Sequence, residues 1–115
     1  ANKIKYINLS SLINLISIDL SENEFEIVRK ASFNGVRRVI TLILSRNKLK
    51  DVEIDTFQEM ISLKSIYLEK NVLKEIKENL FNQQRNLEIL DLSENYIEII
   101  YLRSFAGLMN IRSIN

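Results

Sequence analysis

The chain has 115 residues, of which 46% are hydrophobic and 27% charged, a composition that fits one globular unit and leaves little room for two independent domains. Sixteen Lys and Arg against fifteen Asp and Glu leave a formal net charge of +1, so no overall attraction to nucleic acid or to an acidic surface is expected. The absence of Cys and His from these residues excludes disulfides, thiolate catalysis and the commonest metal ligands, and no apolar run approaches the roughly 18 to 20 residues that cross a bilayer.

The sequence repeats itself with a period of 24 residues. The segments that begin at Leu15, Val39, Leu63 and Leu87 all fit L-x-x-L-x-L-x-x-N-x-L, with Ile, Val or Phe in some of the Leu positions. A period in this range indicates a solenoid, in which each copy forms one coil and neighbouring coils share a continuous core. The asparagines that mark the period are Asn23, Asn47, Asn71 and Asn95.

In chain order, the period gives a leading partial repeat at 1–14, complete repeats at 15–38, 39–62, 63–86 and 87–110, and a trailing partial repeat at 111–115. The leading partial repeat contributes Ala1, Ile4, Leu9 and Leu12 to the apolar pattern. Because both ends of the chain fall inside a repeat, we expect this single solenoid segment to be part of a longer one.

Alternating side chains predict one short strand per repeat, near residues 17–21, 41–45, 65–69, 89–93 and 113–115. Each coil returns the chain to the same edge in the same direction, so these strands are expected to pair in parallel about 4.8 Å apart. The expected fold class is an α/β solenoid: a right-handed leucine-rich coil with one parallel sheet on its concave face and irregular or short helical segments on its convex face.

Two positions of the repeat are predicted to be structural. Each Asn of the period stands where the chain leaves the strand, so its amide can bond backbone groups of its own and adjacent coils in a buried ladder. A Phe in the second half of each repeat is expected to stack beneath the convex side. Three residues after that Phe the repeat has another apolar position, and Gln84 is the one polar residue found there. The stacking residues are Phe33, Phe57, Phe81 and Phe105.

Other candidate sites are explained by the repeat itself. Carboxylate pairs such as Asp19 with Glu22 could suggest acid–base chemistry or a cation site, but they recur with the S-E-N turn, and no Gly-bearing calcium loop surrounds them. We therefore predict no enzyme activity, no catalytic residue, no cofactor and no metal site. Asn8-Leu9-Ser10 is the only N-x-S/T sequon, which makes Asn8 a glycosylation candidate if the chain is secreted.

These repeats resemble the 24-residue typical class of extracellular leucine-rich repeat proteins, L-x-x-L-x-L-x-x-N-x-L-x-x-L-x-x-x-x-F-x-x-L-x-x, over essentially the whole chain. The class includes Toll-like receptor ectodomains, Slit and chaoptin-like adhesion proteins, small leucine-rich proteoglycans and secreted insect immune proteins. The resemblance implies an extracellular location, either secreted or in the ectodomain of a membrane protein. The proline that often follows the fourteenth position of the family repeat is absent here; the residues in its place are Arg29, Glu53, Lys77 and Tyr101.

The outward-facing residues of the predicted strands form the expected concave face. They are free to vary while the core positions stay fixed, so they are the candidate partner-binding residues. Tyr67 is the leading candidate because aromatic side chains often anchor interfaces. The alternative is that Ile43 merely favours the strand and the charges keep the sheet solvated. The candidates on the strands are Asp19, Ile43, Tyr67, Asp91 and Glu69, and those in the edge column just after the strands are Arg46 and Lys70.

Two function classes follow from this interpretation. The first is an extracellular protein–protein recognition module, in an innate-immune receptor or a secreted immune factor. The second is a cell-adhesion or structural scaffold protein that uses the solenoid for spacing, or for assembly with itself or with another protein. In both, the expected partner is a protein, with no nucleic acid and no direct insertion of this segment into a membrane.

Overall fold

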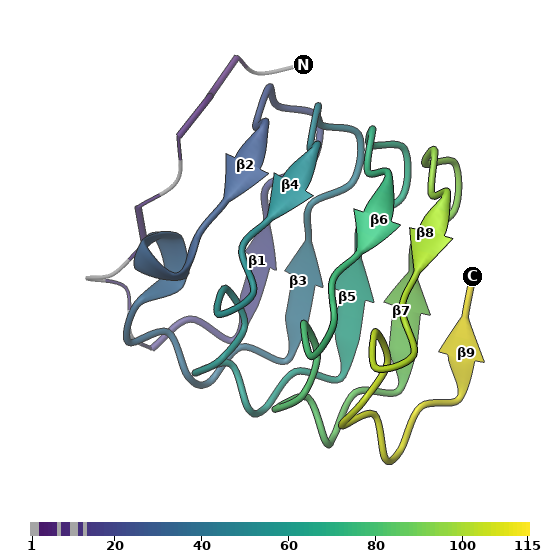
Figure 1. Ribbon diagram of the computed structural model, residues 1–115. Helices are drawn as coiled ribbons and strands as arrows, with labels where there is room; N and C mark the ends of the chain where they lie inside the picture. The colour runs from purple at the N-terminus through teal and green to yellow at the C-terminus, as the bar shows by residue number, and fades with distance from the viewer. Residues whose placement is uncertain (1–2, 7, 10–11, 13) are drawn as a thin grey trace.

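The computed structural model describes residues 3–6, 8–9, 12 and 14–115. Its main feature is a five-stranded sheet in which one strand comes from each coil (Figure 1). All neighbouring strands are parallel, and each residue lies beside the one 24 positions later, as Ser17 does beside Thr41. The predicted parallel solenoid is therefore confirmed. In order across the sheet the strands are β1 (Ser17–Asp19), β3 (Thr41–Ile43), β5 (Ser65–Tyr67), β7 (Ile89–Asp91) and β9 (Ser113–Ile114).

Each of the first four strands of this sheet ends about two residues earlier than the sequence predicted. The parallel ladder continues for a short distance, because Leu44 N–H donates to Tyr67 O at 2.8 Å and Arg46 N–H donates to Glu69 O at 3.0 Å. The chain then turns sharply at the residue before each asparagine of the period, which has a left-handed backbone. The φ angles are 56° at Glu22, 57° at Arg46, 58° at Lys70 and 53° at Glu94.

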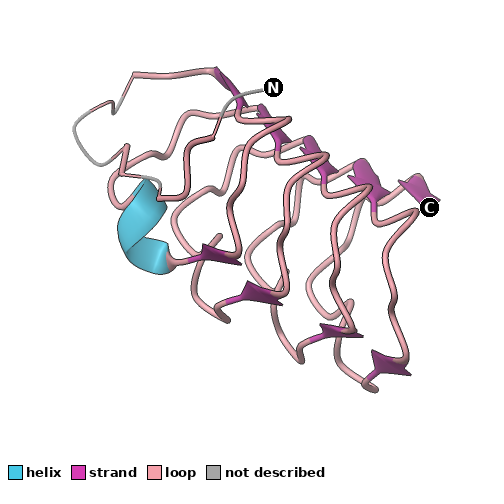
Figure 2. Ribbon diagram, turned by 90° about the horizontal axis from the view of Figure 1, so that it is seen from above, coloured by secondary structure: helices cyan, strands magenta, loops and turns pink. Residues whose placement is uncertain are grey.

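A second row of strands lies on another side of the coil (Figure 2), where the sequence predicted irregular or short helical segments. β2 (Ile27–Val28) pairs in parallel with β4 (Asp51–Val52), and β6 (Glu75–Ile76) with β8 (Ile99–Ile100). Among the described residues the only helix is the 3₁₀ turn η1 (Lys30–Phe33) in the first complete coil. The return segments of the other coils are turns, so the helical content is lower than expected.

The predicted asparagine ladder is confirmed by its hydrogen bonds, although Asn95 is half-buried where a buried residue was expected. The Asn71 amide group donates to Leu44 O of the preceding coil and to Leu68 O of its own coil, both at 3.0 Å. Its Oδ1 accepts a bond from Leu49 N–H at 3.0 Å, and only 3% of the residue is exposed. Asn47 and Asn95 make the same three kinds of bond. Each of these three asparagines thus joins two coils through their backbones.

The aromatic stack is only partly as predicted, because Phe105 is half-buried and the one stacked ring pair among the described residues lies in the two middle coils. The odd glutamine belongs to the core. Phe57 and Phe81 are stacked with ring centroids 5.8 Å apart and an interplanar angle of 8°. Gln84 is 1% exposed, and its Nε2 donates to Phe57 O at 2.7 Å and to Met60 O at 3.3 Å. The polar side chain therefore fits the core because the preceding coil supplies its acceptors.

The leading partial repeat departs from the period. In the later coils, the backbone N–H that follows Asn47 or Asn71 donates to Phe25 O or Leu49 O of the preceding coil. Glu24 N–H instead donates to Ile4 O, at 3.0 Å, although the period assigns Ala1 to this place. The part of the leading segment around Ile4 is thus shifted by three residues relative to the prediction. Leu9 and Leu12 keep the predicted places, because Leu12 N–H donates to Leu9 O at 2.9 Å as Val36 N–H does to Phe33 O at 3.0 Å. Ala1 lies outside the described residues. So does Ser10, the last residue of the sequon, whereas Asn8 is described and exposed.

Candidate protein-interaction face

The concave face is the solvent-facing side of the five-stranded sheet, and its central row is set by the strand register. Asp19 pairs with Ile43, Ile43 with Tyr67, and Tyr67 with Asp91. In each strand these residues alternate with a buried residue, so their side chains share the outer side of the sheet. The sheet therefore brings together four of the seven candidates, in a row of roughly 14 Å at the usual strand spacing.

The two carboxylates at the ends of this row are held by their own repeats. Asp19 Oδ1 accepts bonds from Ser21 N–H at 3.0 Å and Ser21 Oγ–H at 2.6 Å. Asp91 makes the same pair of bonds with Ser93, at 2.9 and 2.6 Å. The Ser21 hydroxyl, and after it the Ser21 backbone N–H, lowers the pKa of Asp19 below its ordinary value of 3.8. Both aspartates thus have a structural role at the end of the strand.

The middle of the row is different because Ile43 and Tyr67 replace the aspartates. Both side chains are half-buried, and they lie side by side on adjacent strands. Glu69 follows two residues after Tyr67 in the next row, in the place that serine occupies in the other three complete repeats. The centre of the concave face thus combines an aliphatic, an aromatic and a carboxylate side chain.

Arg46 and Lys70 stand at the rim of the face. Both occupy the left-handed turn that ends the strand ladder, so they mark the edge of the sheet instead of continuing its rows. Lys70 Nζ lies 3.7 Å from Glu94 Oε1 of the next coil. Arg46 is exposed, and no ion pair to it is found among the described residues.

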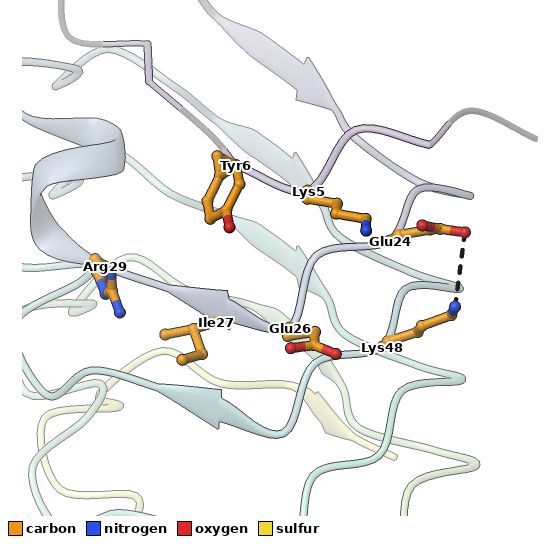
Figure 3. A pocket seen from close by; sticks show the side chains of 7 residues that line it. All are labelled: Lys5, Tyr6, Glu24, Glu26, Ile27, Arg29 and Lys48. Carbon is orange, nitrogen blue, oxygen red and sulfur yellow. Dashed lines mark ion pairs between the residues drawn. The ribbon is translucent and has the colours of Figure 1, made fainter.

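A cleft of about 410 Å³ lies away from the concave face, between the leading segment and the edge of β2 (Figure 3). Lys5 and Tyr6 form one wall of the cleft, and its opposite wall comes from the first two complete coils. The charged residues of that opposite wall are already in ion pairs: Glu24 with Lys48, Glu26 with Lys50, and Arg29 with Glu53. The cleft therefore offers few uncommitted groups to a ligand, and we favour the concave face.

The Asp–Ser hydrogen bonds of the concave face were not predicted from the sequence. The sequence signal was present, because Asp-Leu-Ser occurs in the first and fourth complete repeats, whereas the middle repeats have Ile-Leu-Ser and Tyr-Leu-Glu. The described residues contain no group of three or more Asp, Glu, His or Cys that could hold a metal ion. No helix within the described part of the chain is long and apolar enough to span a membrane.

A family model described as leucine rich repeat matches residues 13–73, 37–84 and 61–115, which together cover most of the chain. No curated protein sequence matches this chain.

Three solved structures show the same fold. Internalin C2 from Listeria monocytogenes is 18% identical with a TM-score of 0.79, over 98% of this chain and 47% of that one. A chain of the Toll–Spatzle complex of Drosophila is 20% identical with a TM-score of 0.80, over 89% of this chain and 16% of that one. A chain of the TLR13–ssRNA13 complex is 25% identical with a TM-score of 0.66, over 99% of this chain and 20% of that one. The present chain thus spans less than half the length of each.

Proposed function

Because the chain belongs to the leucine-rich repeat family, we propose that it is a protein-recognition module that binds a protein partner through its concave face. The observation that carries the proposal is the register of Ile43 and Tyr67, two half-buried apolar side chains at the centre of the sheet. The asparagine ladder and the parallel strands hold them on a rigid frame, which lowers the entropy lost on binding. No feature of the described residues points to enzymatic chemistry.

We propose further that recognition takes place outside the cell, in a receptor ectodomain or a secreted immune factor. The resemblance of the repeats to the extracellular class supports this location. The similar Toll–Spatzle complex is described as a hub in development and innate immunity, in a glycosylated form. The exposed Asn8 is the matching glycosylation candidate in this chain.

Site-directed photo-crosslinking in the intact protein tests the recognition proposal. One protein carries the crosslinking residue in place of Tyr67, and a control carries it in place of Gln58, an exposed residue in a return segment. We expect a specific protein to be captured at position 67. Unlabelled wild-type protein should compete with that capture, whereas an unlabelled Ile43→Lys variant should not.

Capture at position 58 in place of position 67 would contradict concave recognition. It would favour the second function class, an adhesion or scaffold protein that makes its contacts outside the concave face. Capture of a second copy of the same chain would identify self-association directly.

A further inference from the structure

The three central rows of the concave face carry negative charge only. These rows comprise positions 17, 41, 65, 89 and 113, positions 19, 43, 67, 91 and 115, and positions 21, 45, 69 and 93. They contain the carboxylates Asp19, Glu69 and Asp91, and no Lys or Arg. Arg46 and Lys70 stand at the rim, and Lys70 faces Glu94. A partner that covers this face therefore meets a centre that is complementary to a basic side chain.

Two polar atoms in the middle repeats lack partners within the chain. Ser45 is 3% exposed, and its Oγ is buried with no hydrogen-bond partner. Glu69 Oε2 is likewise buried and unpartnered. In the first and fourth complete repeats, the serine at the position of Ser45 bonds an aspartate two residues earlier. Ile43 and Tyr67 stand in those aspartate positions here, so neither Ser45 nor Glu69 has an equivalent bond.

The strand ladder places these two residues next to each other. Arg46 N–H donates to Glu69 O, so residues 45 and 69 occupy the same row on adjacent coils, about 4.8 Å apart at the usual spacing. Ile43 and Tyr67 occupy the neighbouring row on the same two coils. An unpaired carboxylate, an unpaired hydroxyl, an aromatic ring and an aliphatic side chain thus meet at one point of the face.

We propose that Glu69 and Ser45, with Tyr67 and Ile43 beside them, form a subsite for an arginine side chain of the protein partner. The inference rests on the proposed recognition function. A guanidinium has five N–H donors and no acceptor, which suits two acceptors one strand apart, and its flat face stacks on an aromatic ring. Its methylene stem packs on apolar neighbours. The Glu69 carboxylate turns about its broad terminal torsion to present the enclosed oxygen as the guanidinium enters.

The first test measures the melting temperature of the full chain with one serine replaced. An unpartnered buried hydroxyl contributes nothing to stability, whereas a bonded one does. Ser45→Ala is therefore expected to melt at the same temperature as the wild type or higher, and the matched control Ser93→Ala to melt lower. An equal drop for the two variants would show that Ser45 is bonded within the chain and would overturn the subsite.

The second test is an NMR titration of the full chain with Nα-acetyl-arginine methylamide, compared with its neutral citrulline analogue. We expect dose-dependent shifts of the Ser45, Tyr67 and Glu69 signals with the arginine probe only. Glu69→Gln should weaken that binding by roughly tenfold, since it removes the charge and keeps the shape. Equal shifts with citrulline, equal binding by Glu69→Gln or the absence of shifts would each overturn the proposal.

Neither test uses the natural partner, so its outcome is separate from that of the crosslinking experiment. Capture of a partner at position 67 together with unchanged partner affinity in Glu69→Gln would leave concave recognition standing and remove the arginine subsite.

Discussion

Asn71 illustrates how one side chain at a fixed position of the repeat connects two coils. Its amide satisfies Leu44 O and Leu68 O, and its Oδ1 satisfies Leu49 N–H. The sequence predicted this role because the asparagines recur at one interval beside core leucines. It did not predict the left-handed residue that precedes each of them, since Glu, Arg and Lys at that place carry no preference for a positive φ.

Replacing Asn71 by Ala is expected to lower the free energy of unfolding by about 2 kcal/mol or more. The substitution leaves buried backbone groups of two coils unpaired, each at a cost of about 1–3 kcal/mol. Urea denaturation measures the change, and the exposed amide Gln58→Ala is the control, with an expected change of less than about 0.5 kcal/mol. Similar losses in the two variants would contradict the ladder.

Because the Asp19 carboxylate is hydrogen-bonded in the folded chain, we expect it to make the stability of the chain depend on pH. Its folded-state pKa is lowered, so its contribution to stability is present above its ordinary value of 3.8 and is lost as the pH falls through the lower folded-state pKa. The melting temperature of Asp19→Ala should therefore lie furthest below that of the wild type near neutral pH, and the two should converge in acid. A gap that stays constant into strong acid would show that ionised Asp19 does not stabilise the strand end.

At the scale of elements, the strands of the five-stranded sheet could be predicted from the sequence, whereas the paired two-residue strands on the other side of the coil could not. The sheet strands come from apolar alternation in every repeat, whereas β2, β4, β6 and β8 have two residues each, too few to show a period. The shift at the start of the leading segment was also not predicted. The period alone assigns Ala1 to the place beside Glu24, but the backbone carbonyl of Ile4 accepts the Glu24 N–H there, while the Ile4 side chain stays exposed.

Gly107 tests the close packing of the return segments. Its φ is +94°, and a Cβ added there would lie 2.5 Å from the Cα and O of Asn82 in the preceding coil. Gly107→Ala is therefore expected to lower the free energy of unfolding by about 2 kcal/mol or more, from the left-handed backbone and the overlap together.

Gln83 is the matched control for Gly107, because it holds the same repeat position one coil earlier, is exposed and has no positive φ. Gln83→Ala should change the free energy of unfolding by less than about 0.5 kcal/mol. A loss in Gln83→Ala equal to that in Gly107→Ala would show that Gly107 is not the point of close contact.

At the scale of the whole molecule, each of the seven ion pairs found among the described residues joins two different coils. Exposed pairs of this kind contribute little to stability, typically less than about 1 kcal/mol each. The stack therefore depends mainly on the shared core and on the ladders of backbone and asparagine hydrogen bonds. The surface is left free to vary, which is why the sequence predicts the frame well and the partner only by chemical class.

The central row of the concave face spans roughly 14 Å, whereas a standard interface covers about 800 Å² on each partner. Energetic hot spots nevertheless concentrate at central, desolvated aromatic residues. Tyr67 is half-buried at this centre, whereas Tyr96 is 65% exposed and follows the asparagine turn, off the sheet. The two tyrosines thus form a matched pair for testing where recognition takes place.

The affinity of the captured partner for Tyr67→Ala and Tyr96→Ala, measured by calorimetry in the intact protein, tests concave recognition most directly. We predict that Tyr67→Ala weakens binding by about tenfold or more, because hot-spot truncations cost about 2 kcal/mol, while Tyr96→Ala changes it by less than about twofold. Unchanged affinity in Tyr67→Ala, with a loss in Tyr96→Ala, would contradict recognition through the concave face.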